Sequence, residues 1–192
     1  MIEKIVARSR SYRAFYESRT VTQAELVDLI SVARLCPSAM NRQPLKYRLV
    51  YEREEVETLL SITKWGGMLP DLVLPPDGKH PTAFIVVCCD TELCNSIDSA
   101  RFDAGVVSQT IMLAAAERGL GGCILGAFDK SRATEILSIN EKNVPIVILA
   151  LGKPDENVVL CDTDDSGSIA YYRDEAGTHF VPKRSLEELI IK

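Results

Sequence analysis

A long helix, predicted over residues 95–118, constrains the fold of this 192-residue chain more than any other segment. From Val106 to Ala116 its side chains are apolar nearly all round, which is typical of a helix at the centre of a protein. Its many alanines permit close packing, either in the core or at a subunit interface. The stripe expected to pack consists of Ile97, Arg101, Ala104, Val107, Ile111, Ala114 and Ala115.

Apolar strands and shorter helices surround this helix in an irregular order. Residues 82–90 form a continuous apolar strand, a pattern that predicts burial on both faces of a sheet. The capping box Thr22–Glu25 begins a helix that ends near Leu35. Further strands are predicted over 46–51 and 144–151, and further helices over 1–8, over 54–63 and from the N-cap Asp129 to 137. Mixed elements in this order favour a single α+β domain over residues 1–192.

Composition and charge exclude several classes of protein. The chain is 46% hydrophobic with a formal net charge of -5, so it carries no basic footprint for nucleic acid. No apolar run approaches the roughly 20 residues of a membrane span. The amino terminus has no apolar signal-peptide core. We therefore expect a cytoplasmic protein with no nucleic-acid or membrane partner.

The six cysteines and two histidines do not predict a metal centre. No cysteines are spaced as Cys-x-x-Cys, the tight spacing that zinc sites usually need. Cys88 and Cys89 lie within the apolar strand and are interpreted as core residues, and Cys123 as a small buried residue. Structural disulfides are not expected without a secretory signal. His80 and His179 are isolated in sequence and are interpreted as surface residues.

A polar loop between two prolines follows the helix that begins at Thr22. It reads Pro37-Ser38-Ala39-Met40-Asn41-Arg42-Gln43-Pro44, and neither a helix nor a central strand can continue through it. Hydrogen-bonding side chains in a loop between rigid elements are typical of a binding segment. We expect this loop to hold a flat polar ligand.

A glycine-rich segment, Gly119–Asp129, follows the long helix. A dinucleotide-binding glycine loop follows a strand and opens a helix, whereas this one follows a helix and leads into a short strand. The spacing also differs, because Ile124 stands where a third glycine is needed. A Rossmann site is therefore rejected. The bare backbone at Gly126-Ala127 could instead approach a ligand closely.

Basic residues near the amino terminus allow two interpretations. Arg10 and Arg13 lie three residues apart with hydroxyls between them, as in an anion clamp, but these residues alone favour a solvated basic turn. Residues 64–81 are rich in proline and glycine and predict an irregular binding loop or lid. Within it, Trp65 either covers a ligand or plugs the core.

The tail over residues 155–192 is polar with an apolar end, and a second capping box spans Ser185–Glu188. An apolar end of this kind is expected to pack against another protein surface. The tail therefore either wraps a partner subunit or covers its own sheet.

Five motifs in order, taken together, resemble the nitroreductase family of FMN-dependent oxidoreductases across nearly the whole chain. They are Arg10–Phe15, Pro37–Pro44, Gly119–Gly121 with Gly126, Ala150–Pro154 and Lys183-Arg184. The resemblance implies an α+β sandwich with an antiparallel-rich mixed sheet flanked by helices. It also implies an intertwined homodimer with FMN in two interface sites, the tail reaching over the partner.

The resemblance further assigns residues to the cofactor. Arg10, Ser11 and Arg13, with Lys183 and Arg184, would take the phosphate end, although a slip of the register would involve Arg8 in place of Arg10. The ring and its ribityl chain would lie against two segments. These comprise Pro37, Ser38, Ala39, Met40, Asn41 and Gln43, and the backbone of Leu125, Gly126 and Ala127.

The implied reaction is hydride transfer from NADH or NADPH to flavin N5, then to a nitroaromatic, quinone or activated alkene, in a ping-pong cycle. The flavin carries this chemistry, so no side chain is assigned as catalytic. One alternative is a specialised family reaction, such as reductive dehalogenation or oxidative flavin fragmentation. Others are a flavin store or sensor without turnover, and a protein that binds no flavin. Ser9 and Leu45 depart from the family pattern, and no particular acceptor follows from it.

Overall fold

The core of the protein is a four-stranded antiparallel sheet in the order β1-β2-β4-β3. The computed structural model describes residues 1–94 and 96–191. The strands are β1 (Leu45–Val50), β2 (Ala83–Asp90), β3 (Gly121–Leu125) and β4 (Asn143–Gly152). Every residue of β2 is buried, which confirms the prediction that this strand is covered on both faces.

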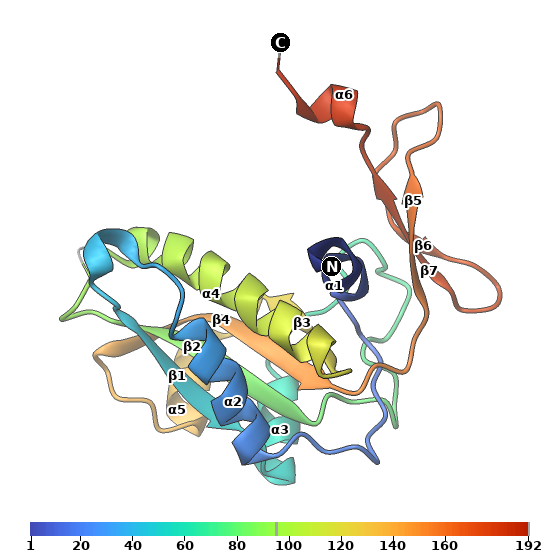
Figure 1. Ribbon diagram of the computed structural model, residues 1–192. Helices are drawn as coiled ribbons and strands as arrows, with labels where there is room; N and C mark the ends of the chain where they lie inside the picture. The colour runs from blue at the N-terminus through green and yellow to red at the C-terminus, as the bar shows by residue number, and fades with distance from the viewer. Residues whose placement is uncertain (95, 192) are drawn as a thin grey trace.

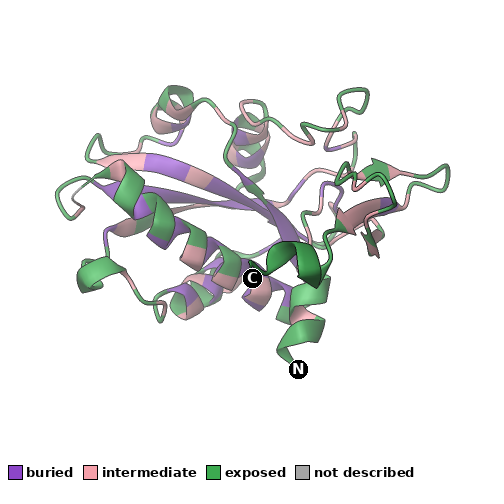
Figure 2. Cartoon of the chain, turned by 90° about the horizontal axis from the view of Figure 1, so that it is seen from above, coloured by how far each residue is buried: buried purple, intermediate pink, exposed green. Residues whose placement is uncertain are grey.

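Helices cover both faces of this sheet (Figure 1). One face packs against α2 (Gln23–Ala33) and α4 (Ile97–Glu117), and the other against α3 (Arg53–Leu60) and α5 (Lys130–Ile136). Because side chains alternate along a strand, β2 supplies both cores. Ile85, Val87 and Cys89 face α4, whereas Phe84, Val86 and Cys88 face α3 and α5. Figure 2 shows the buried strands between partly exposed helices. The α+β prediction is confirmed.

Local sequence signals set several helix ends. The Thr22 hydroxyl accepts a hydrogen bond from the backbone of Glu25, whose side chain caps Thr22 in return. Asp129 caps α5 by accepting from the Arg132 backbone N–H at 2.9 Å. Pro145 is the third residue of β4, an inner strand of the sheet. It stands opposite Cys88, where the ladder shifts register and does not need its missing N–H.

The central helix α4 is capped by Ser96 and ends at Glu117, close to the predicted range. The predicted start at Asn95 lies outside the described residues. The expected packing stripe is wrong at one position, since Arg101 faces solvent and pairs with Asp98 at 3.6 Å. None of the described helices is long and apolar enough to cross a bilayer.

The tail forms its own small sheet and does not cover the main one. Strands β5 (Val158–Asp162), β6 (Tyr172–Arg173) and β7 (His179–Lys183) have the order β5-β7-β6. The short helix α6 (Leu186–Leu189) follows, capped by Ser185 as predicted, and has no buried residue. It projects away from the body of the chain (Figure 1). Its apolar side chains Leu186, Leu189, Ile190 and Ile191 are exposed.

Two short elements and one irregular segment complete the chain. Helix α1 (Ile2–Arg8) contacts α4, and the 3-10 turn η1 (Ala39–Asn41) lies in the polar loop. Residues 64–81 contain no helix and no strand, as predicted.

Candidate functional site

A cavity of about 300 Å³ lies where the amino-terminal segment, α4, β3 and the tail sheet meet. Ser11 forms a bridge with Gly122 of β3, and the Tyr12 N–H donates to the Gly122 carbonyl at 2.9 Å, which fixes the amino-terminal segment here. The cavity is lined by Ser9, Arg10, Ser11, Arg13, Gln109, Met112, Gly122, Ile124, Val158, Tyr171, His179, Val181 and Lys183.

Arg13 is buried at the wall of this cavity, with only 8% of its surface exposed. Its guanidinium donates to the Ser11 carbonyl at 3.0 Å and lies 5.1 Å from the centre of the Tyr171 ring. Its Nε is buried without a hydrogen-bond partner. The solvated basic turn is therefore wrong for Arg13. A buried guanidinium with a free donor suits an anion clamp.

Arg10 and Lys183 bring positive charge to the same cavity from opposite ends of the chain. Arg10 donates to the Val6 carbonyl and retains a buried Nε without a partner. Within residues 1–94 and 96–191, no carboxylate lies at ion-pair distance from Arg10, Arg13 or Lys183. Three cations without a counter-charge make the cavity a suitable site for a phosphate group.

His179 belongs to this cavity, although its sequence suggested a surface residue. The residue is only 1% exposed, because the tail sheet places β7 against Arg13 and Tyr171. Burial lowers the pKa of His179 to about 4, and the positive charges of Arg13 and Arg173 add to this effect. The imidazole is therefore neutral at neutral pH.

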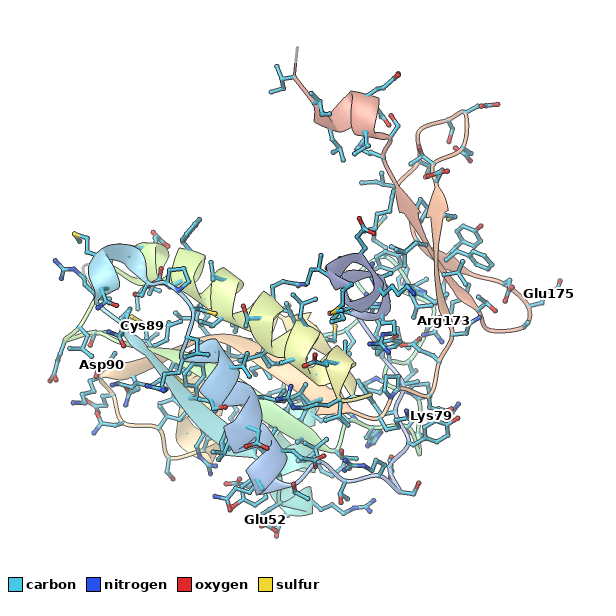
Figure 3. The ribbon with its side chains drawn as sticks, in the orientation of Figure 1. Glu52, Lys79, Cys89, Asp90, Arg173 and Glu175 are labelled. Carbon is cyan, nitrogen blue, oxygen red and sulfur yellow. The ribbon has the colours of Figure 1, made fainter. Side chains whose placement is uncertain are left out.

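The tautomer of His179 follows from its neighbour. Arg13 Nη1 lies 3.3 Å from His179 Nε2, and an arginine can only donate, so Nε2 accepts and Nδ1 carries the hydrogen. That Nδ1 is buried without a partner. On the tail side of this cluster, Arg173 pairs with the nearly buried Glu156 at 2.6 Å (Arg173 is labelled in Figure 3).

A second cavity, of about 280 Å³, lies beside the polar loop. It contacts α4 at Asp103 and Val107, whereas the first cavity contacts α4 at Gln109 and Met112. Asp103 and Met112 are separated by about two and a half helical turns and so point to opposite sides of the helix. The second cavity is lined by Ile30, Ala33, Arg34, Cys36, Pro37, Ser38, Gln43, Pro44, Leu45, Lys46, Tyr47, Asp103 and Val107.

The polar loop has an unusual backbone held by a buried acid. Met40, Asn41 and Gln43 have φ angles of 51°, 53° and 49°, in the left-handed region that non-glycine residues rarely adopt. The Ser38 hydroxyl donates to Asp103 at 2.6 Å, and the Ala39 N–H donates to the same carboxylate. Such conformations persist only when the surroundings impose them, and they cluster at ligand sites.

The other residues predicted to bind the cofactor differ in exposure and in whether they line a cavity. Leu125 is buried and pairs with Ile148, whereas Gly126 and Ala127 follow the end of β3 with exposed backbone. Arg184 pairs with Glu188 at 3.1 Å and lines neither cavity, so the structure does not bring it to Arg10, Arg13 and Lys183. Arg10 rather than Arg8 lines the first cavity.

Comparison of the sequence with protein families identifies the family to which this chain belongs. Residues 6–69 and 95–153 match the model of the nitroreductase family. The chain belongs to the nitroreductase family. It is therefore an oxidoreductase by family.

Individual members of the nitroreductase family agree with this assignment. A protein from Methanothermobacter thermautotrophicus, named "Putative NADH dehydrogenase/NAD(P)H nitroreductase", is 34% identical over 88% of this chain and 85% of its own length. A protein of the same name from Archaeoglobus fulgidus is 29% identical over 84% of this chain and 90% of its own.

Solved structures show the nitroreductase fold. A nitroreductase family protein from Streptococcus pneumoniae TIGR4 matches all of both chains with a TM-score of 0.70 at 20% identity. An FMN-dependent nitroreductase from Clostridium difficile R20291 matches 85% of this chain and 92% of its own with a TM-score of 0.65 at 23% identity.

Several residues around the two cavities were not predicted from the sequence of this nitroreductase. They are Gln109, Tyr171 and His179 at the first cavity, and Asp103 at the second. Only Asp103 carried a local signal, an acid within a helix expected to be buried. Trp65 packs against the core beneath α3 and donates to the Thr63 hydroxyl at 2.8 Å, which favours a core plug over a ligand cover.

Proposed function

We propose that the protein is an FMN-dependent oxidoreductase. In this proposal a hydride passes from NADH or NADPH through flavin N5 to a nitroaromatic, quinone or activated-alkene acceptor, in a ping-pong cycle. The family match supports the cofactor class, and the names of the relatives support a nicotinamide donor. The observation that carries the proposal is the cationic cavity around Arg10, Arg13 and Lys183.

The residues at this cavity fit the phosphate end of FMN. A phosphate dianion needs several donors and more than one cation, and the buried Nε atoms of Arg10 and Arg13 lack partners among residues 1–94 and 96–191. Lys183 adds a third cation. His179, neutral with its hydrogen on Nδ1, adds a donor without further repulsion between positive charges.

The polar loop is proposed to hold the flavin ring. Asn41 and Gln43 present side-chain amides, and the bond from Ser38 to Asp103 fixes the loop that carries them. Gly126 and Ala127 would offer exposed backbone to the ring edge. Bound FMN supplies the redox chemistry, and these groups bind and orient it. No triad or metal cluster is required.

The two halves of this site lie on opposite sides of α4, which supports a homodimeric assembly. The phosphate half of one subunit would meet the loop half of another across α4. Phe102 on α4 is 75% exposed, and the apolar end of the tail, Leu186 to Ile191, has no cover within the described chain. We propose that residues 1–192 form one domain whose tail, residues 155–192, wraps the partner subunit.

Anaerobic redox titration tests the proposed activity. Protein reconstituted with FMN should lose its flavin absorbance on addition of NADH or NADPH and regain it when a quinone is added. A flavin that stays oxidised with both nicotinamides would contradict the enzyme proposal. A flavin that is bleached but is not reoxidised by quinone, nitroaromatic or activated alkene would contradict the proposed acceptors.

A further inference from the structure

A pair of thiols lies near the carboxyl end of β2, an inner strand of the sheet, away from the cationic cavity. Cys89 is at the end of β2, and Cys94 is in the segment that leads from β2 to α4. Their sulfur atoms are 2.8 Å apart. Figure 3 shows Cys89 beside Asp90 at this end of β2. Both thiols are free, and no other pair of cysteine sulfurs in the described chain is in contact.

A tight turn brings the two thiols together. The N–H groups of Leu93 and Cys94 both donate to the Asp90 carbonyl, at 3.1 and 3.2 Å. The Glu92 N–H donates to the Asp90 carboxylate at 3.1 Å. The turn therefore folds Cys94 back over Cys89. A disulfide bond of about 2.05 Å would need a sulfur shift below 1 Å, within the reach of side-chain rotation.

The two sulfurs differ in access. Cys89 is buried against the core on the α4 side of the sheet, whereas Cys94 is partly exposed. Burial raises the pKa of Cys89 to about 12, and its hydrogen bond with Cys94 adds to this effect. A reagent in solution reaches Cys94 first. Cys89 is then placed to react with whatever is attached to Cys94, as a resolving cysteine does.

We propose that Cys89 and Cys94 form a thiol–disulfide exchange site for low-molecular-weight disulfides such as oxidised glutathione. Cys94 gives up its proton and its thiolate attacks one sulfur of the small disulfide. A mixed disulfide forms, the original S–S bond breaks, and the departing thiolate takes up the proton to become the first free thiol. Cys89 sulfur then attacks Cys94 sulfur, and the Cys89 proton passes to the departing thiolate. Two protein thiols are oxidised to one disulfide while one small disulfide is reduced to two thiols. The bond is reversible, as expected for a redox-responsive rather than a structural disulfide.

The position of the pair links it to the polar loop. Cys89 is paired with Leu45 in the sheet, and the Asp90 N–H donates to the Pro44 carbonyl at 2.8 Å. The same turn leads into α4, which carries the Asp103 that holds Ser38. A bond between Cys89 and Cys94 would therefore fasten the β2–α4 connection that supports both ends of the loop.

Mass spectrometry of the full-length protein tests the site. Incubation of the reduced protein with oxidised glutathione should produce a species that has lost two hydrogens, and peptide mapping should place the bond between Cys89 and Cys94. Dithiothreitol should reverse it. A wild-type protein that remains fully reduced, or that ends with glutathione stably attached to Cys94, would overturn the proposal.

Single variants distinguish the attacking cysteine, Cys94, from the resolving cysteine, Cys89. Cys89→Ala, which keeps a small apolar group in the core, should trap glutathione on Cys94 as a stable mixed disulfide. Cys94→Ser should take no glutathione at Cys89. Cys36→Ser is the matched control, since Cys36 contacts Thr110 and should leave the Cys89–Cys94 bond unchanged. Glutathione on Cys89 in the Cys94→Ser protein would contradict the assigned roles. If a variant fails to fold, the mass-spectrometry result on the wild-type protein still decides whether the Cys89–Cys94 bond forms.

Discussion

The hydroxyl of Ser38 lies 2.6 Å from a carboxylate oxygen of Asp103, a residue 3% exposed on the central helix. The Gln43 N–H donates to the Ser38 oxygen at 3.0 Å, so one carboxylate holds both ends of a loop with three left-handed residues. The acid stands on α4, which packs along the sheet. The geometry of the proposed flavin-ring half thus depends on a residue outside the loop.

Replacing Asp103 should loosen this loop. In Asp103→Ala the half-buried Ser38 hydroxyl and the N–H of the exposed Ala39 lose their acceptor. Water can reach these groups, so the cost is the net value of a hydrogen bond, about 0.5–1.5 kcal/mol each. We expect a lower urea midpoint and weaker FMN binding, measured by quenching of flavin fluorescence. The control is Asp98→Ala, an exposed acid on the same helix. Wild-type FMN affinity in Asp103→Ala would show that the loop does not bind the cofactor.

Lys183 and Arg184 are adjacent in sequence but should differ in effect. Lys183 lines the cationic cavity, whereas Arg184 pairs with Glu188 outside it. Lys183→Ala should weaken FMN binding by about tenfold or more, since a hydrogen bond to a charged group is worth about 1.5–3 kcal/mol. Arg184→Ala should leave it unchanged. Riboflavin, which lacks the phosphate, should bind both variants alike, and equal loss for FMN in both would contradict the assignment.

His179 should make the folded state sensitive to acid. Its pKa is about 4 in the folded protein, below the ordinary value of 6.5. Between pH 4 and 6.5 the His179 side chain is therefore protonated in the unfolded chain and neutral in the folded chain. The stabilising contribution is complete above pH 6.5 and is lost as pH falls toward 4, at about 1.36 kcal/mol per pH unit.

Chemical denaturation at several pH values checks this effect. His179→Gln keeps an acceptor for Arg13 and does not titrate in this range. Its free energy of unfolding should fall less steeply than that of the wild type from pH 6.5 to 4. Parallel curves for the two proteins would show that His179 takes up its proton in the folded state.

Two glycines at opposite ends of β3, Gly122 near its start and Gly126 just after its last residue, should respond differently to substitution by alanine. A Cβ on Gly122 would lie 2.0 Å from the Ala150 carbonyl oxygen, so Gly122→Ala should be strongly destabilised. A Cβ on Gly126 would meet nothing within 4 Å, so Gly126→Ala should unfold at the wild-type urea concentration. If flavin approaches the bare backbone there, Gly126→Ala should still bind FMN more weakly. Unchanged FMN affinity would remove Gly126 from the site.

Local signals in the sequence predicted much of the fold. The capping boxes at Thr22–Glu25 and Ser185–Glu188 and the fully apolar β2 depend on neighbouring residues alone, and all three are present. The tolerance for Pro145 in β4 comes instead from a register shift on the neighbouring strand β2, which no pattern local to Pro145 shows.

The cavities depend on contacts between residues far apart in the chain. His179 and Arg13 are 166 positions apart, and no local pattern shows that the tail sheet buries one against the other. Arg184 was grouped with Lys183 by adjacency, whereas alternation along an extended chain separates them. The separation of the two halves of the site by α4 follows from which helix face each residue occupies, and the sequence motifs do not contain that information.

A mixed dimer tests the central claim, that each FMN site combines the phosphate half of one subunit with the loop half of the other. One subunit would carry Arg10→Ala with Lys183→Ala, and the other Asn41→Ala with Gln43→Ala, under separate affinity tags. Each homodimer should retain no FMN. The doubly purified mixed dimer should contain one intact site and bind one FMN. A mixed dimer without FMN would contradict the claim, because a site built within one chain is damaged in both subunits.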